Sequence, residues 1–264
     1  MNRIFLCLFS FFLFTLLSAQ EWRLVQSFPA KDIDSWDVDP MGKVIYSKKD
    51  VLIKLDSNFR VMFRQSLKGV GVIQIIDARH ALKTLIFSEE QQAIAFLDNT
   101  LTFHQSVHDL SGSNVSYSTN ASYSAQSNRY WVYDTDNSKL MLFDEMQHQP
   151  MVIENLAGIM GELVVNDLRE MENTLLVLDR SKGIYLFDYY GTLIDLVETG
   201  GAMSVSLVKG FVFYLTTEAL VRFDVRSRDE ILFRLPDNEV IDFRIVGESI
   251  YLRTAEGIKK YLLK

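Results

Sequence analysis

Hydrophobic and polar residues alternate along most of this chain in short runs, separated by clusters of Pro, Gly, Asn and Asp. In the stretch that begins at Trp36, alternating or hydrophobic runs cover residues 36–39, 43–47, 51–55 and 60–65. Four short runs joined by tight turns are the pattern of consecutive antiparallel hairpins. The sequence therefore predicts an all-β fold.

The third run of this stretch ends in a phrase of hydrophobic residues followed by aspartate, and the phrase occurs five times. Its aspartates are Asp56, Asp98, Asp144, Asp188 and Asp224, which are 42, 46, 44 and 36 residues apart. A decayed copy covers residues 258–262. A period near 40 made of short strands is typical of a β-propeller with one blade per repeat. We expect each aspartate to form a turn by accepting the backbone N–H two residues on.

The two ends of the chain complement each other. The sixth repeat ends after its third strand, whereas residues 22–28 form an unpaired strand ahead of the first repeat. We therefore predict a six-bladed propeller of four-stranded antiparallel blades, closed by strand 22–28 joining the C-terminal blade. The outer strand of the second blade is expected at residues 101–105. The best helical candidate, 156–173, is interrupted by glycines, so almost no helix is expected in the domain.

The first residues have the composition of a secretory signal peptide. Arg3 precedes a 14-residue apolar run, Ile4–Leu17, and Ser18 and Ala19 are small residues suited to cleavage. A retained anchor is the alternative, but roughly 20 residues are needed to span a bilayer. We predict a signal peptide at 1–19, a single propeller domain at 20–264, and an exported protein, periplasmic or extracellular.

Composition limits the partners. The only cysteine, Cys7, lies in the predicted leader, so the mature chain is expected to contain no disulfide. The formal charge is −7 and becomes −8 without Arg3, and no basic cluster is present. Such a chain is poorly suited to nucleic acid, which requires concentrated Lys and Arg. With no further apolar segment for a membrane, we expect a protein or peptide partner in the cell envelope.

Three stretches resemble NHL repeats, which build six-bladed propellers. Residues 36–46 carry an Asp-Pro-x-Gly turn, residues 131–144 an Asp-x-x-Asn loop before Phe-Asp, and residues 185–193 a Phe-Asp-x-x-Gly turn. The likeness covers the whole mature chain in period but only these blades in motif. It implies a module that binds proteins, peptides or other ligands on one face. A few propellers of similar shape are lactonases or lyases, and the fold alone does not choose between these functions.

No catalytic motif is evident. The four histidines (His80, His104, His108 and His148) lack the context of a triad, and no metal site or cofactor is expected. Candidate binding residues are those expected at the starts of inner strands and in the loops of the third blade. They are Asp34, Trp36, Gln74, Tyr117, Tyr123, Asp134, Asp136, Asn137, Asp167 and Asp242. A solvent-filled polar lining is the alternative interpretation of the channel residues.

The segment Ser111–Asn128 stands out because it has no charge and seven of its 18 residues are serine. Tyrosine and serine together are typical of adaptable binding loops, although a flexible connection has the same composition. The sequence thus favours an exported, non-catalytic module that holds a protein or peptide on one face. A metal-dependent lactonase- or lyase-type enzyme and a structural subunit of an envelope assembly remain as alternatives.

Overall fold

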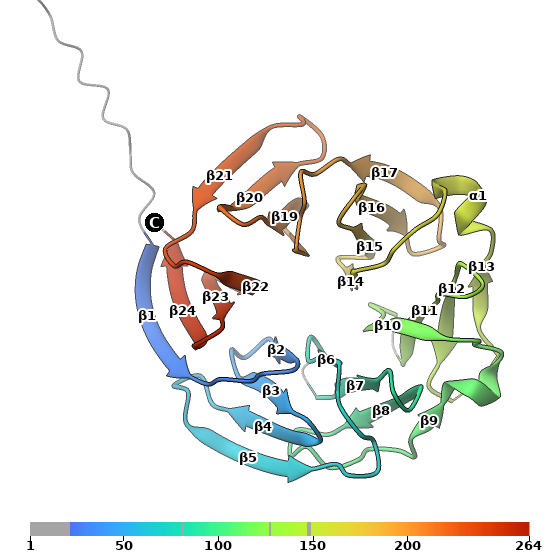
Figure 1. Ribbon diagram of the computed structural model, residues 1–264, viewed down its shortest axis with the longest axis horizontal. Helices are drawn as coiled ribbons and strands as arrows, with labels where there is room; N and C mark the ends of the chain where they lie inside the picture. Colours follow the sequence, from blue (N-terminus) through green and yellow to red (C-terminus); the bar gives the residue numbers. More distant parts are fainter. Residues whose placement is uncertain (1–21, 81, 127, 147–148, 264) are drawn as a thin grey trace, which may run out of the picture.

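The computed structural model describes residues 22–80, 82–126, 128–146 and 149–263. These residues form six four-stranded antiparallel sheets arranged in a ring around a central channel (Figure 1). The protein is therefore a six-bladed β-propeller, as the repeat period predicts. The predicted signal peptide, residues 1–19, lies outside the described residues.

The first five blades each consist of four consecutive strands, innermost first. They are β2 (Trp36–Val38), β3 (Val44–Lys48), β4 (Val51–Leu55) and β5 (Val61–Ser66) in blade 1; β6 (Ile75–Asp77), β7 (Thr84–Ser88), β8 (Ala93–Leu97) and β9 (His108–Asp109) in blade 2; β10 (Ser118–Tyr123), β11 (Arg129–Asp134), β12 (Lys139–Asp144) and β13 (Met151–Ile153) in blade 3; β14 (Asp167–Met171), β15 (Thr174–Asp179), β16 (Gly183–Asp188) and β17 (Leu193–Val197) in blade 4; and β18 (Ser204–Val208), β19 (Phe211–Leu215), β20 (Ala219–Asp224) and β21 (Glu230–Arg234) in blade 5.

Blade 6 joins the two ends of the chain. Strands β22 (Val240–Val246), β23 (Ser249–Thr254) and β24 (Gly257–Leu263) come from the C-terminal end, and β1 (Trp22–Pro29) is the outer strand. Strand β1 pairs with β24 antiparallel, from Trp22 opposite Leu263 to Pro29 opposite Gly257. The predicted closure of the ring is confirmed.

The repeated aspartates form turns between the third and fourth strands, as expected. Asp56 Oδ1 accepts the backbone N–H groups of Asn58 and Arg60, both at 2.8 Å. The other four aspartates of the phrase also accept the N–H two residues on, at 2.8–2.9 Å. The motif is thus explained by local backbone hydrogen bonding.

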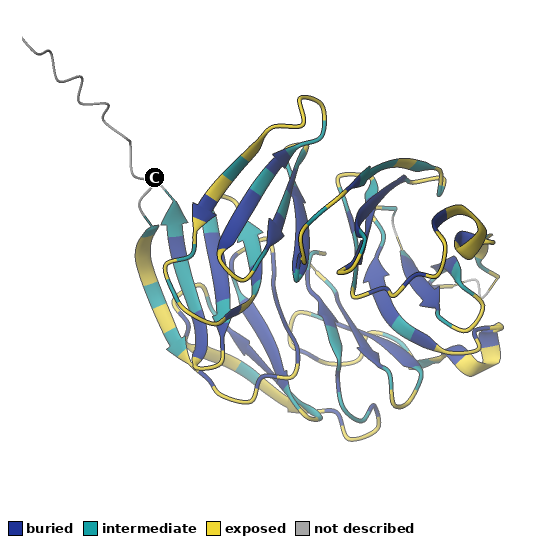
Figure 2. Cartoon of the chain, turned by 45° about the horizontal axis from the view of Figure 1, so that its top comes forward, coloured by how far each residue is buried: buried dark blue, intermediate teal, exposed yellow. Residues whose placement is uncertain are grey.

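Each sheet packs against a neighbour on both faces. In blade 3, Tyr130 and Val132 belong to the core shared with blade 2, whereas Trp131 and Tyr133 belong to the core shared with blade 4. Alternation along a strand therefore places apolar side chains in two different inter-blade cores. Only the outermost strands, such as β1 and β5, expose much of their length, as Figure 2 shows.

The outer strand of blade 2 departs from the prediction of residues 101–105. Leu97 and Phe103 form only an isolated bridge, and β9 resumes at His108–Asp109. Leu101 is fully buried with a left-handed φ of 67°, so it belongs to the turn built on Asp98. The buried turn delays the start of the strand.

Helix is scarce, as expected. The described residues contain one five-residue α-helix, α1 (Leu156–Met160), and one 3-10 helix, η1 (Leu110–Ser113). Helix α1 lies in the segment that the sequence marks as the best helical candidate, but β14 begins soon after it. Neither helix has the length to cross a lipid bilayer.

Candidate functional site

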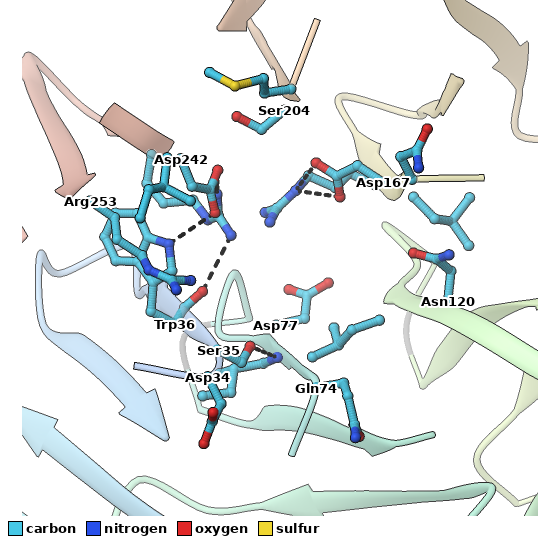
Figure 3. A pocket seen from close by; sticks show the side chains of 18 of the residues that line it. Asp34, Ser35, Trp36, Gln74, Asp77, Asn120, Asp167, Ser204, Asp242 and Arg253 are labelled. Atoms are coloured by element: carbon cyan, nitrogen blue, oxygen red, sulfur yellow. Dashed lines mark hydrogen bonds and ion pairs between the residues drawn. The ribbon is translucent and has the colours of Figure 1, made fainter. Parts of the chain in front are cut away.

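A cavity of about 340 Å³ lies at one end of the central channel (Figure 3). All six blades contribute to its lining. Each blade supplies at least one polar residue, for example Asp34, Gln74, Asn120, Asp167, Ser204 and Asp242. They lie in or just before the innermost strands, so the chain delivers them to the channel at regular intervals along its length.

Several residues at the rim of this cavity also hold the loops between second and third strands. Gln74 Oε1 accepts the backbone N–H of Glu89 at 2.8 Å, and Asn166 Oδ1 accepts that of Arg180 at 2.9 Å. Asp34 accepts the backbone N–H of Lys49 in the same way. The rim and these loops therefore share one face of the propeller, which we call the mouth face.

A belt of charged side chains, here called the channel belt, forms part of the cavity lining and extends toward the opposite end of the channel. It consists of Asp37, Asp77, Asp167, Asp242, Arg79, Arg169 and Arg244, which face the channel from blades 1, 2, 4 and 6. Its centre is Asp37, which is fully buried. Asp37 accepts the Nε–H of Arg244 at 2.6 Å and the backbone N–H of Ala78 at 2.7 Å.

Arg244 connects two carboxylates of the belt. Its Nη1 donates to Asp242 at 2.7 Å, and its guanidinium lies 5.0 Å from the centre of the Trp36 ring. Asp242 also accepts the indole N–H of Trp36 at 2.9 Å. Burial opposes ionisation of Asp242, but the charges of Arg244 and Arg169 and these hydrogen bonds outweigh it and lower the pKa of the carboxyl.

Arg169 connects two carboxylates of the belt, Asp167 and Asp37. Its Nε lies 3.2 Å from both carboxylate oxygens of Asp167, and its Nη1 is 3.8 Å from Asp37. Burial opposes its charge, but the surrounding carboxylates raise the pKa of Arg169. Arg169 and Arg244 also line a second cavity of about 260 Å³ at the opposite end. The belt therefore separates the two ends of the channel.

Asp77 is the belt carboxylate that pairs with Arg79. It accepts the Nε–H of Arg79 and the backbone N–H of Tyr123, both at 2.9 Å. Burial would raise its pKa, but Arg79 and the hydrogen bonds prevail and lower the pKa from 3.8 to about 2. The carboxylate is therefore ionised throughout the physiological pH range.

This shift predicts a contribution of Asp77 to acid stability. An aspartate in the unfolded chain takes up its proton near pH 3.8, whereas folded Asp77 does so near pH 2. Its stabilisation is thus complete above pH 4 and is lost as the pH falls from 4 to 2, by about 2 kcal/mol. Urea unfolding between pH 2 and 5 should show a shallower decline for Asp77→Asn than for the wild type. The exposed Asp136→Asn serves as control, and equal slopes for wild type and Asp77→Asn would contradict the assignment.

The structure brings half of the predicted site residues together. Asp34, Trp36, Gln74, Asp167 and Asp242 all line the mouth cavity. The other five belong to blade 3 and do not line it.

In blade 3, the predicted loop residues mainly hold one another. Asp134 is fully buried and accepts the N–H of Ser116 at 3.1 Å and the amide of Asn137 at 3.0 Å. Asp136 is exposed at the tip of the loop. Here an aspartate and an asparagine shape the loop, and the Asn137 side chain also donates to Ser116 Oγ at 2.8 Å.

The two tyrosines of the serine-rich segment have different environments. Tyr117 is 38% exposed and donates to Glu89 at 2.6 Å, on the mouth face. Tyr123 is only 5% exposed and packs against Phe96, with ring centres 5.6 Å apart. Tyr123 therefore belongs to the core between blades 2 and 3, and only Tyr117 is available at the surface.

Sequence reasoning missed the arginines of the belt. A signal for them exists, because three of the four Asp-x-Arg sequences in the chain, Asp77–Arg79, Asp167–Arg169 and Asp242–Arg244, begin in an innermost strand. Residues two apart on a strand face the same side, so the pairs in β14 and β22 enter the channel together, and Arg79, which follows β6, pairs with Asp77. The three pairs belong to blades 2, 4 and 6, and their positions alternate around the ring.

No family model matches the sequence, and no curated protein matches it. Solved structures do match the fold. Virginiamycin B lyase from Staphylococcus aureus superposes with a TM-score of 0.66 at 10% identity, covering 92% of this chain and 100% of that one. A catalytically inactive histidine-to-alanine variant of that lyase with quinupristin gives 0.63 at 12% identity, with the same coverage.

A protein of unknown function from Bacteroides thetaiotaomicron gives a TM-score of 0.68 at 10% identity, covering 92% of this chain and 72% of that one. At such identities a structural likeness establishes the fold and leaves the chemistry open. The chain thus shares a propeller fold with these proteins over nearly all of its described length.

Proposed function

We propose that this protein is an exported, non-catalytic binding module that holds a protein or peptide partner at the mouth face. The observation that supports this proposal is the polar cavity at the channel mouth, with lining side chains from every blade. The resemblance of three stretches to NHL repeats, whose propellers bind ligands on one face, points the same way.

The lining suits a polar peptide segment. Four aspartates (Asp34, Asp77, Asp167 and Asp242) and four arginines (Arg169, Arg180, Arg244 and Arg253) balance its formal charge. Neutral groups such as Gln74 and Asn166 offer hydrogen bonds at the rim. Ser204 Oγ is buried in the lining and has no hydrogen-bond partner among the described residues. Such a group is available to a ligand that brings its own polar atoms.

The charged groups of the belt are already fixed by one another. Ion pairs and hydrogen bonds hold Asp77 with Arg79 and Asp242 with Arg244. Donors and acceptors that are already held in place lose less conformational entropy when a ligand binds. General acids and bases work best with a pKa near the working pH, whereas the pKa of Asp77 and that of Asp242 are lowered. These two carboxylates thus favour recognition over the enzyme alternative that the lyase neighbours suggest.

Affinity capture from the native envelope, with mass spectrometry, tests the proposal. Arg180 and Ile241 are exposed residues of the mouth lining, so Arg180→Glu combined with Ile241→Glu adds negative charge without disturbing the core. We expect the partner recovered with the wild type to fall at least tenfold with this double variant. Arg60→Glu, in a turn on the opposite face, is the matched control and should capture normally.

Thermal unfolding should confirm that both variants remain folded. Equal recovery of every partner by the wild type and the double variant would contradict binding at the mouth face. Conversion of quinupristin by the purified protein would show that the enzyme alternative is correct instead.

A further inference from the structure

A further opening, larger than the two channel cavities, lies between blades 5 and 6. It is a groove of about 820 Å³ between the facing sides of the two sheets. Its apolar walls include Phe211, Phe213 and Ile231 on blade 5 and Ile245, Ile250 and Leu263 on blade 6. We call it the blade 5–6 groove.

The groove exists because the two sheets pack closely at one end only. Leu215 and Leu252 are fully buried in the shared core. Phe213, Ile231 and Ile245 pack against the same core but are only partly buried. The sheets therefore leave apolar side chains uncovered, and their burial by a ligand would be favourable.

The charged residues of the groove are mostly basic. Arg23, Lys209 and Arg222 line it together with a single carboxylate, Glu248, which gives a local formal charge of +2 in a chain of −7. None of the three cations forms an ion pair with another described residue. The Arg222 guanidinium instead lies 4.8 Å from the centre of the Phe211 ring. The cations are thus available to an anion at the groove.

We propose that the blade 5–6 groove binds a long-chain fatty acid, with its acyl chain along the apolar walls and its carboxylate at the basic residues. A mostly apolar lining with a few polar groups is typical of small-molecule sites of this volume. A carboxylate forms its strongest hydrogen bonds with charged donors such as Arg222. Both halves of the ligand therefore have a counterpart in the groove.

A peptide fits these walls less well than an acyl chain. The walls are the side-chain faces of two sheets, whose backbone groups are hydrogen-bonded within their own sheets. A peptide lying there would bury N–H and C=O groups without partners, which is unfavourable. Methylene groups carry no such cost, so the structure favours a fatty acid over a peptide at this position.

Fluorescence titration of the purified protein with cis-parinarate tests the proposal. We expect saturable binding of one probe per chain, displacement by palmitate, and binding of palmitate methyl ester at least tenfold weaker. The combined variant Arg23→Gln, Lys209→Gln, Arg222→Gln should weaken parinarate binding at least tenfold. Arg226→Gln, on an exposed turn of blade 5 outside the groove, should leave it within twofold of the wild type.

A second variant tests the apolar walls. Ile245→Trp fills the groove and should abolish parinarate binding, and its unfolding midpoint, followed by circular dichroism, verifies that it folds. Equal affinity for palmitate and its methyl ester, or unchanged binding by the triple variant, would overturn the proposal. A third outcome would also overturn it: the wild type forms a dimer and binds no parinarate, and Ile245→Trp dissociates the dimer. The groove would then be the contact between two copies of the chain.

Discussion

Replacing Arg244 with methionine is expected to lower the free energy of unfolding by about 3–5 kcal/mol at pH 7. Arg244 is the nearest cation to the fully buried Asp37 and also pairs with Asp242. Methionine fills much of the same space but leaves both carboxylates without this cation. Chemical denaturation of the two proteins at pH 7 measures the difference.

The loss should shrink in acid, because protonated carboxylates no longer need a counter-charge. Without Arg244 the pKa of Asp242 loses its main lowering influence and rises, so protonation restores part of the stability as the pH falls. The double variant Asp37→Asn, Arg244→Met should lose less unfolding free energy than the two single variants lose in sum. Arg226→Met, which is exposed, should change stability by less than about 0.5 kcal/mol. A loss below about 1 kcal/mol for Arg244→Met would contradict a structural role for the belt.

Replacing Gly257 with alanine is expected to destabilise the protein by about 3 kcal/mol or more. Gly257 begins β24 opposite Pro29 of β1, with a φ of +152°. A Cβ at this position would lie 2.1 Å from the carbonyl oxygen of Phe28 and 2.8 Å from the backbone nitrogen of Ala30. Because both obstacles are backbone atoms, the substitution must push β1 away from β24 and open the ring. Thermal unfolding together with hydrogen exchange of the β1 amides measures this effect.

Substitutions at two other glycines separate the effect on ring closure from the general cost of adding a Cβ to a glycine. Gly183 holds the equivalent position in blade 4, where a Cβ would lie 2.3 Å from the Val197 carbonyl oxygen, so Gly183→Ala should also destabilise but leave β1 protected. Gly210 has a φ of +77° with nothing within 4 Å of a Cβ, so Gly210→Ala should cost only about 1 kcal/mol. Equal effects of Gly257→Ala and Gly210→Ala would show that β1 is not held as the structure indicates.

Much of the fold follows from local chemistry that the sequence displays. Each repeated aspartate, such as Asp56, satisfies backbone groups within four residues of itself. Strand pairing within a blade likewise joins neighbouring segments, apart from the pairing of β1 with β24. Even that pairing was predictable, because a three-stranded repeat at one end and a spare strand at the other leave one way to complete the ring.

The site was only half predictable. Asp34 and Gln74 could be placed at the mouth because strand order alone puts them at the starts of inner strands. Tyr123 could not be distinguished from Tyr117, since a composition of serine and tyrosine does not reveal which side of a strand faces the core. The same holds for the 101–105 strand, where burial of Leu101 decides the local conformation.

The sequence by itself determined the number of blades, their strand order and the closure of the ring, because these depend on patterns repeated about every 40 residues. Only the tertiary structure decided the rest. Asp37 and Arg244 are 207 residues apart and meet only once the ring is closed. The blade 5–6 groove depends on how closely two neighbouring sheets pack along their length, which arises from the fit of many side chains and leaves no periodic trace in the chain.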